Sequence, residues 1–445
     1  MVMTKRSLAT LTLLFAGAAQ ATPQAELILL EDLPGAHDGM ALRAVSADGE
    51  TVTGQAFFYG APSPSGPQLM RFDVQTQEFT LLPATGGDLR SASANAQTAF
   101  GVTFTEDPWD PGRFGLFGWF FRDGDTDKTL VPNQFPNTFS EVWRASADGS
   151  TIVGMINFQR IFNPCCDEFS DAYFWDLDTM QAPQTLPDLA SGSGRTAATT
   201  VSADGQLFAG FAQFFDETAA AVIWDRSGGL LRVEVPGSDS ERFIHMSANG
   251  RFIAGFALMD PGSGFGDFRE DAFMFDVQTQ TLTMLGQTPA PFKSASPTWV
   301  ADDGSTVIGI LDQFGFYDNP SGDAFIWTET RGLERLIDHV EANYQGVNFD
   351  AFRALSTAYT SGDGKTIVGN ALTQDGCCMV PYVLRLDVAP SCPADLTGDG
   401  VVDADDFFLF LQLFAAGDSR ADFNNDGVID ADDFFAYLSA FADGC

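Results

Sequence analysis

The stretch Ala145–Gly154, ASADGSTIVG, recurs along the chain and decides its fold. Similar phrases end at glycines that lie roughly 50 residues apart, and one copy, SANAQTAFG, has lost the glycine of its turn. The closing glycines of the seven copies are Gly54, Gly101, Gly154, Gly210, Gly255, Gly309 and Gly369. A repeat of this length is typical of propellers, solenoids and repeat arrays.

Each copy predicts a β-hairpin. Asp-Gly or Asn-Gly between apolar runs favours a type I′ turn, in which both central residues have positive φ. The serine hydroxyl and the aspartate carboxylate can also accept hydrogen bonds from nearby backbone amides and fix the turn. Catalysis or metal binding by Asp48, Asp148 and Asp204 is the alternative. Because the acid recurs with the repeat, we favour the role in the turn.

Two further strands follow each hairpin. The third ends in a large apolar residue, as in YFWDLDT around Trp175 and VIWDRS around Trp224, and a short fourth strand comes next. Four strands in each of seven repeats predict a seven-bladed β-propeller over residues 22–389. The last repeat lacks its fourth strand, so we expect Glu26–Pro34 to pair with Pro381–Asp387 and to close the ring.

The SADG phrase resembles the HAF-type extracellular repeats and, more loosely, the Asp-box hairpins of sialidase-like propellers. That resemblance implies an exported β-propeller. Polysaccharide lyases and sialidases also use propellers, but a fold alone does not assign a function.

The balance of charge restricts the partners. The chain has 445 residues and a net charge of −37, with only 23 lysines and arginines. Such acidity argues against nucleic acid and against an anionic membrane surface as partners. It favours solubility and is compatible with cation binding.

The first 21 residues predict a secretory signal peptide. Lys5 and Arg6 precede the apolar stretch Leu8–Ala18, and Ala19-Gln20-Ala21 matches the small-x-small cleavage pattern. No other apolar run is long enough to cross a membrane. We therefore expect a secreted or cell-surface protein with no transmembrane segment after cleavage; an uncleaved anchor is the alternative.

Two near-identical segments end the chain, Asp395–Gly417 and Asp422–Gly444. Each begins with the spacing of an EF-hand calcium loop, which delivers the six oxygen ligands that calcium needs. The expected ligands of two calcium ions are Asp395, Thr397, Asp399, the Val401 carbonyl, Asp403 and Asp406, and then Asp422, Asn424, Asp426, the Val428 carbonyl, Asp430 and Asp433. A pair of acidic surface turns is the alternative.

The module at residues 392–445 departs from EF-hands, because loop position twelve is Asp and no helix precedes either loop. Both departures are similar to dockerins, and the Gly-Cys ending resembles the GC-type dockerin of exported planctomycete-type bacterial proteins. The resemblance implies a small all-α domain that binds a cohesin-like or cell-surface protein. Phe408 and Phe435 are candidate partner contacts, with packing inside the module as the alternative.

Export permits disulfides. The six cysteines suggest three bonds, Cys165–Cys166, Cys377–Cys378 and Cys392–Cys445. The last would join the two ends of the dockerin-like module. Metal binding by the adjacent cysteine pairs is the alternative, although no nearby histidine completes a zinc site.

Basic residues recur near the first strand of each repeat. They are Arg43, Arg90, Arg144, Arg195, Arg242, Lys293 and Arg353. They could surround the mouth of the central channel and bind an anion such as an acidic glycan, or they could form local salt bridges. The long, variable connections should share one face, whose aromatic residues could contact sugars or proteins.

No catalytic motif is recognisable, and the three histidines share no pattern. We therefore interpret the chain as a secreted, surface-attached binding or structural protein with a propeller that binds a glycan or another ligand. The alternative is a carbohydrate-active enzyme, either a polysaccharide lyase or a glycoside hydrolase. A central pocket with a tyrosine or histidine beside an arginine would favour the enzyme; a shallow aromatic face would favour binding.

Overall fold

The computed structural model describes residues 23–31, 33, 39–58, 66–107, 114–132, 138–159, 169–179, 182–189, 194–213, 218–260, 268–313, 322–376, 378–388, 394, 396–397, 402–424 and 428–443. The chain is mainly β, as the alternating apolar runs after each turn predict. In this part of the chain, no helix is long and apolar enough to cross a membrane.

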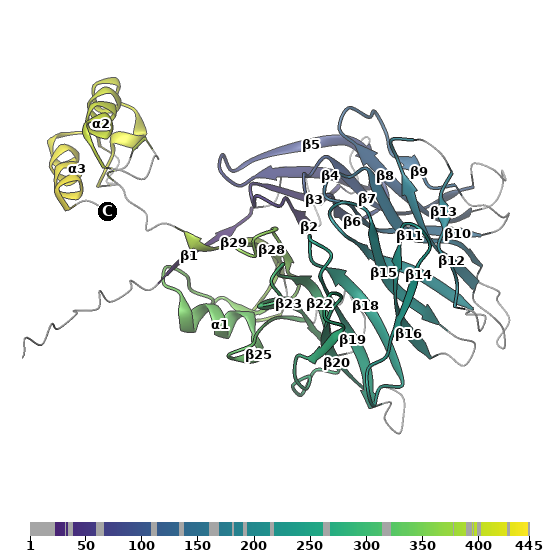
Figure 1. Cartoon of the computed structure of the whole chain (residues 1–445). Helices are drawn as coiled ribbons and strands as arrows, with labels where there is room; N and C mark the ends of the chain where they lie inside the picture. Colours follow the sequence, from purple (N-terminus) through teal and green to yellow (C-terminus); the bar gives the residue numbers. More distant parts are fainter. Residues whose placement is uncertain are drawn as a thin grey trace, which may run out of the picture.

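The strands assemble into antiparallel groups of about four, in chain order (Figure 1). The first groups are β2 Met40–Val45, β3 Thr51–Phe58, β4 Gly66–Asp73 and β5 Glu78–Thr85; β6 Asp88–Ala92, β7 Thr98–Glu106, β8 Phe114–Arg122 and β9 Thr129–Leu130; and β10 Phe139–Ala145, β11 Thr151–Gln159, β12 Phe169–Asp176 and β13 Gln184–Thr185. The next are β14 Arg195–Val201, β15 Leu207–Gln213, β16 Ala219–Asp225 and β17 Leu230–Val233; β18 Ser240–Met246, β19 Phe252–Asp260, β20 Arg269–Asp276 and β21 Thr281–Met284; and β22 Ser294–Val300, β23 Thr306–Asp312, β24 Asp323–Thr328 and β25 Gly332–Arg335. In the last group, β26 Phe352–Leu355 and β27 Tyr359–Thr360 both pair with β28 Thr366–Thr373, which is followed by β29 Met379–Val388 and β1 Gln24–Leu29.

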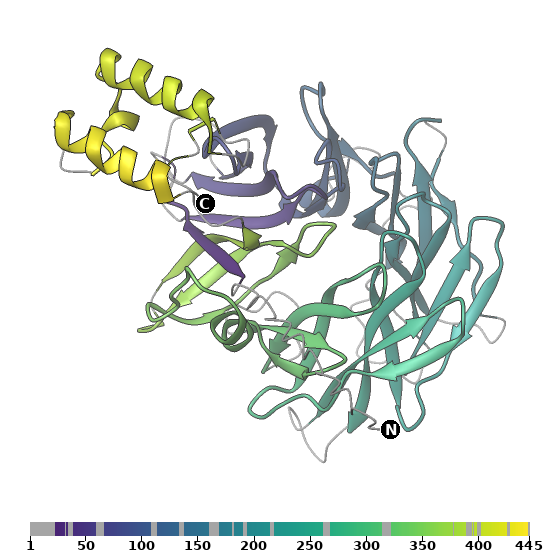
Figure 2. The same cartoon turned by 60° about the vertical axis from the view of Figure 1, so that its left-hand side comes forward.

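The first strands of successive groups contact one another around a closed ring. β2 contacts β6, and the contacts continue through β10, β14, β18 and β22 to β27, which returns to β2. Backbone hydrogen bonds between neighbouring hairpins reinforce the ring, for example from Ala47 N to Ala94 O (2.7 Å) and from Gly362 N to Ala47 O (3.0 Å). Sheets arranged in this way form a β-propeller, seen obliquely in Figure 2.

The expected closure by the N-terminal strand is confirmed. β1 pairs antiparallel with β29, with Glu26 opposite Arg385 and Leu29 opposite Tyr382, and Figure 1 shows the two strands side by side. Arg385 Nη1 also lies 3.1 Å from Glu26 Oε2. The strand begins at Gln24 and ends at Leu29, so it is shifted toward the N-terminus relative to the predicted segment. The free edge of the last sheet is therefore covered by the first strand of the chain.

The SADG hairpins have a different turn from the one expected. Gly49 N donates to Ser46 O (3.0 Å), and Ser46 N donates to Thr51 O (2.8 Å). Gly49 has φ +79°, whereas Asp48 is not among the residues with positive φ. A type I turn followed by a left-handed glycine fits these data, so the type I′ prediction was wrong. Asp48 Oδ1 accepts hydrogen bonds from Ser46 Oγ (2.5 Å) and from Glu50 N (3.1 Å), which hold the turn.

The closing glycine of each copy is required by close packing of two strands. In the third group, the pairing of β10 with β11 slips by one residue between Val142 and Arg144. This bulge brings the Glu141 carbonyl against the backbone of Gly154, where a Cβ would lie 2.0 Å from that oxygen. A residue with a side chain would clash with backbone, so the repeat retains glycine here.

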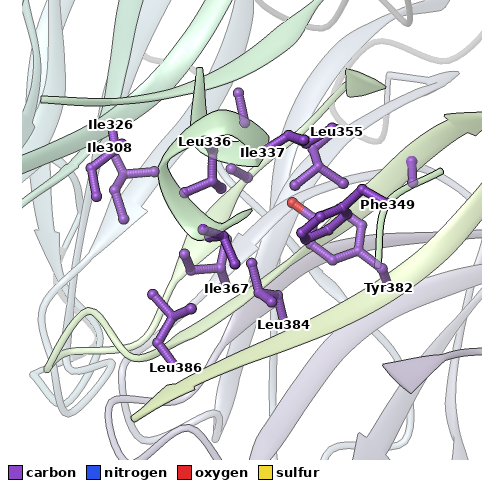
Figure 3. Close-up of a cluster of buried hydrophobic side chains, with 14 of the residues drawn as sticks. Ile308, Ile326, Leu336, Ile337, Phe349, Leu355, Ile367, Tyr382, Leu384 and Leu386 are labelled. Carbon is purple, nitrogen blue, oxygen red and sulfur yellow. The ribbon is translucent and has the colours of Figure 1, made fainter. Parts of the chain in front are cut away.

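The core lies between neighbouring groups. Trp119 of β8, Trp224 of β16 and Phe72 of β4 are almost completely buried, as predicted for third strands. Figure 3 shows the largest cluster, in which Ile308 and Ile326 pack against Ile367 and Leu384 of the last group. Each buried aliphatic side chain of this kind contributes about 1.5–3 kcal/mol to stability.

Helix α1, Leu336–Asn343, completes that cluster and was not predicted from the sequence. Its buried residues Leu336, Ile337 and Val340 follow helical spacing and point into the same core (Figure 3). The sequence LERLI at residues 333–337 is equally compatible with a β-strand. In the structure its first three residues belong to β25 and its last two to α1. Tertiary packing therefore decided the conformation of this segment.

The C-terminal part contains α2 Ala404–Ala416, the 3-10 turn η1 Ser419–Ala421 and α3 Ala431–Asp443. A cluster of aromatic side chains joins the helices, with the rings of Phe410 and Tyr437 stacked 4.1 Å apart between centroids. Asp403 caps α2 in a capping box with Asp406, and Gly417 ends the helix in the left-handed conformation.

One of the three expected disulfides is not formed. Cys378 is an exposed free thiol, so the predicted Cys377–Cys378 bond was wrong. Adjacent Cα atoms lie about 3.8 Å apart across a trans peptide, which is shorter than the separation of about 4.4–6.8 Å that disulfides prefer. Cys165, Cys166, Cys392 and Cys445, on which the other two predictions depend, lie outside the described residues.

Candidate functional site

The C-terminal loops place one buried carboxylate each in the same environment. Asp406 accepts hydrogen bonds from Thr397 N at Oδ1 (2.8 Å) and from Asp403 N at Oδ2 (3.0 Å). In the second loop, Asp433 accepts from Asn424 N at Oδ1 (3.1 Å) and from Asp430 N at Oδ2 (2.8 Å). Both aspartate residues are fully buried. The two segments are therefore structural repeats as well as sequence repeats.

These amide donors control the charge of the two carboxyl groups. Burial alone would raise the pKa of Asp406, but hydrogen bonds from the Asp403 and Thr397 amides outweigh it and lower the pKa. The amide of Asp430 likewise lowers the pKa of Asp433. Both side chains are therefore anionic at neutral pH, which is the form that binds a cation.

The remaining predicted ligands are described only in part. Asp403 and Asp430 are exposed at the start of α2 and α3, where their Oδ1 atoms accept from Asp405 N (2.8 Å) and Asp432 N (2.9 Å). Thr397, Asp422, Asn424 and Val428 belong to the same loops. Asp395, Asp399, Val401 and Asp426 lie outside the described residues. Among the residues that are placed, no group of three or more His, Cys, Asp or Glu side chains is assembled for a metal.

The donor chemistry of both loops fits calcium. Thr397, Asn424 and the aspartates offer only hydroxyl, amide and carboxylate oxygens, which are the ligands that calcium prefers. Neither loop contains the thiol or imidazole groups typical of zinc sites. The buried carboxylate at position twelve already fixes each loop to the first turn of its helix.

Two phenylalanines of the helical module point to solvent. Phe408 of α2 is 58% exposed and Phe435 of α3 is 65% exposed, whereas their neighbours Phe407 and Phe434 pack into the aromatic cluster. The alternative that Phe408 and Phe435 are buried inside the module was therefore wrong. They form an equivalent pair of exposed aromatic side chains, one on each helix.

The second candidate site is a cavity of about 220 Å³ on the axis of the propeller, lined by the first strands and the hairpins that follow them. Arg43 and Arg144 line it, together with His245, Trp299 and Tyr359. Arg43 Nη1 donates to Tyr359 Oη (3.2 Å) across the junction between the first and last groups. Two of the seven recurrent basic residues, Arg43 and Arg144, therefore lie near the channel, as one of the two alternatives from the sequence predicted.

His245 is neutral in this cavity. Burial lowers its pKa well below the usual value, and the positive charge of Arg144 lowers it further. A neutral imidazole offers one N–H donor and one nitrogen acceptor. The cavity therefore combines fixed positive charge from arginine with a polar group that can both donate and accept.

The other recurrent basic residues do not line this cavity. The guanidinium of Arg195 lies over the ring of Phe158 (5.1 Å to the centroid), and that of Arg242 lies over Phe211 (4.7 Å). Arg353 of β26 is exposed. The alternative in which all seven surround the channel mouth was therefore wrong. The recurrent basic residues lie at different distances before the closing glycine, ten residues for Arg144 and sixteen for Arg353, so they do not occupy equivalent positions along the first strands.

No protein-family model matches this chain. A search of curated proteins also finds no match. Among solved structures, the chain is similar to oligogalacturonate lyase from Vibrio parahaemolyticus, with 11% identity and a TM-score of 0.45 over 82% of this chain and 98% of that one. The β-propeller domain of the Trilobed protease from Pyrococcus furiosus gives 12% identity and a TM-score of 0.40 over 65% and 80%. TolB from Acinetobacter baumannii gives 11% and 0.36 over 77% and 78%. These likenesses are too distant to support an argument about function.

Proposed function

We propose that this chain is an exported ligand-binding protein, a seven-bladed β-propeller held at the cell surface by a calcium-dependent, dockerin-like module. The observation that carries the proposal is the duplicated geometry of Asp406 and Asp433. Each accepts two loop amides in an equivalent arrangement at the start of an equivalent helix. A duplicated calcium loop explains why two fully buried acids occur at the same place in two repeats.

Calcium would neutralise the acids that crowd each loop and join the loop to its helix. The first ion would be held by Asp395, Thr397, Asp399, Val401 O, Asp403 and Asp406, and the second by Asp422, Asn424, Asp426, Val428 O, Asp430 and Asp433. Like charges so close together repel one another. Because the loops gain their ligand geometry on binding, the binding energy also stabilises the helices.

Attachment would use the exposed face of α2 and α3. Phe408 and Phe435 provide equivalent aromatic contacts on the two helices, a common feature of protein-binding surfaces. A cohesin-like or other cell-surface protein is the proposed partner. The acidic propeller would then present its channel and loops to a polysaccharide or protein ligand outside the cell.

Calorimetric titration of the mature, secreted chain with calcium tests the module. We expect two ions per chain and an increase in helicity by circular dichroism. Asp395→Ala should remove one ion, Asp422→Ala the other, and the double variant both. Asp148→Ala, in a propeller turn, is the matched control and should leave the stoichiometry unchanged. Absence of calcium uptake by the wild-type chain would overturn both the dockerin-like assignment and the attachment.

A carbohydrate-active enzyme is the second candidate, and one observation favours it. Arg43 donates to Tyr359 within the central cavity, and His245 lies near Arg144. A tyrosine or neutral histidine can remove a proton while an arginine stabilises the adjacent developing charge. Incubation with uronate-containing polysaccharides tests it, because β-elimination creates a double bond that absorbs ultraviolet light. Turnover that Tyr359→Phe abolishes would support this candidate, and a stable absorbance would exclude a lyase for those substrates.

A further inference from the structure

The central cavity contains a ring of seven equivalent positions. Each is the residue of a first strand that pairs with the residue immediately before a closing glycine, as Arg144 pairs with Val153 and His245 with Ala254. The seven residues are Ala44, Ser91, Arg144, Thr200, His245, Trp299 and Tyr359, and all of them line the cavity. Their side chains therefore share one level of the channel.

The composition of this ring differs from that of the repeat around it. The next position along each strand is filled by Val, Ala, Met or Thr, as packing requires. At the shared level, three positions are small, whereas the others are arginine, histidine, tryptophan and tyrosine. Around the ring, the small residues are the first, second and fourth and the large ones the third, fifth, sixth and seventh, so the space is asymmetric. Packing alone does not require this pattern, because polar groups are costly to bury.

Two arginines contribute positive charge to the cavity wall of a strongly acidic protein. Arg43 and Arg144 line it, and the net charge of the whole chain is −37. Among the described residues that line the cavity, Asp302 is the one carboxylate, and its Oδ1 accepts a hydrogen bond from Asn249 N (2.9 Å). Low-dielectric walls strengthen the field of such charges, so the space attracts a small anion.

Nδ1 of His245 and Oγ1 of Thr360 are buried atoms of the cavity wall that have no hydrogen-bond partner within the described protein. A buried polar atom without a hydrogen bond destabilises the folded protein, so a molecule that bonds to these atoms would recover that free energy. The apolar indole of Trp299 is part of the same wall.

We propose that this cavity binds one sugar acid, a pyranose that carries a carboxylate. Arg43 and Arg144 would bind the carboxylate of the sugar. His245 and Thr360 would bond to the hydroxyl groups of the sugar, and Trp299 would contact its ring. The volume of about 220 Å³ is below the range of about 300–1,000 Å³ for drug-sized ligands, which fits a single sugar ring. The inference rests on the ligand-binding part of the proposed function and specifies its ligand, without depending on calcium.

Calorimetric titration of the calcium-loaded full chain with glucuronate and galacturonate tests the proposal, with glucose and inorganic phosphate as comparison titrants. We expect one uronate to bind per chain, no measurable binding of glucose, and weaker binding of phosphate. Arg144→Gln should weaken uronate binding about tenfold or more, because a charge-assisted hydrogen bond contributes about 1.5–3 kcal/mol. Arg353→Gln, a recurrent but exposed arginine outside the cavity, should change nothing.

A second variant protects the test against loss of folding. Ala44→Leu keeps both arginines but fills part of the cavity, so it should prevent uronate binding while thermal unfolding confirms a folded chain. No uronate binding by the wild-type protein at millimolar concentration would overturn the proposal, as would phosphate binding as tightly as uronate. Chelation of calcium should leave uronate binding unchanged. Failure of calcium uptake and failure of uronate binding are thus separate results, and each rejects only its own proposal.

Discussion

Aspartate occupies a repeated loop in both parts of this protein, but in two different environments. In the propeller, Asp148 Oδ1 accepts hydrogen bonds from Ser146 Oγ (2.7 Å) and Ser150 N (2.9 Å), and the turn holds a single acid. In the C-terminal module, Asp406 is fully buried, uses both oxygens, and shares its loop with several other acids. The first arrangement is complete without a cation, and the second concentrates negative charge.

The difference shows that the repetition of an acid does not by itself indicate a site. Asn95 and Asn249 replace the aspartate in two copies of the propeller turn and make the same bonds with neutral side chains. Both copies of the C-terminal loop, by contrast, have an aspartate at position twelve, Asp406 in the first and Asp433 in the second. The number of acids in a loop, together with the use of both carboxylate oxygens, separates a structural turn from a candidate calcium loop.

Removal of β1 should have the largest effect, and only on the propeller. Deletion of residues 23–30 removes the pairing with β29 and the buried side chain of Ala25. Several backbone hydrogen bonds at about 1 kcal/mol each predict a loss of more than about 3 kcal/mol in urea unfolding. The calcium response of the terminal helices should persist in the same chain. An unchanged unfolding midpoint would contradict the closure of the ring by this strand.

A matched pair of substitutions should separate the two kinds of aspartate. Asp148→Asn keeps an oxygen at the bonded position and should change stability by less than about 0.5 kcal/mol. Asp406→Asn places an NH₂ group against a backbone N–H in a buried site and should destabilise α2 by about 2 kcal/mol. Hydrogen exchange of the two regions in each variant measures both effects. An equal loss of hydrogen-exchange protection in the two variants would show that the two carboxylates stabilise their loops to the same extent.

The ion pair of Asp276 with Arg251 should give the propeller a pH dependence. Arg251 Nη2 lies 2.8 Å from Asp276 Oδ2, and this contact lowers the pKa of Asp276 to about 2. The unfolded value is about 3.9. The stabilisation is therefore complete above about pH 4 and disappears as the pH falls through about 2. Asp276→Asn should lower the melting temperature at pH 7 and have little effect near pH 2; an equal effect at both would exclude this linkage.

The smallest effect is expected in the turn that has lost its glycine. Ala96 has φ +57°, the conformation that glycine adopts in six other copies. Ala96→Gly should therefore stabilise the chain by up to about 1 kcal/mol, because a Cβ is disfavoured at positive φ. Gly149→Ala, the reverse change at φ +72°, should destabilise it, since the new Cβ would also lie 2.2 Å from Thr98 Oγ1. Urea unfolding of both variants measures the difference.

The sequence predicted those elements whose signal is local. The turn dipeptides predicted the hairpins, and the large apolar residue of each third strand predicted the core. The absence of a fourth strand in the last repeat predicted the pairing of β1 with that repeat. It did not predict the type I turn, because Asp-Gly is compatible with both turns. It also missed α1, whose helix depends on the core of Figure 3. Because the basic residues lie at different distances from the closing glycines, their recurrence did not show which of them line the cavity; among them, Arg43 and Arg144 do.

The covering of β29 by β1 also has a consequence for the order of assembly. Glu26 and Arg385 lie 359 positions apart, so the first strand to be synthesised has to wait for the last. Long loop closures are slow and entropically costly. During that interval β29 presents an unpaired edge that the β1 strand of a second chain fits equally well. We therefore expect the lifetime of the incomplete ring, rather than the stability of the finished one, to determine how much domain-swapped protein forms at high concentration.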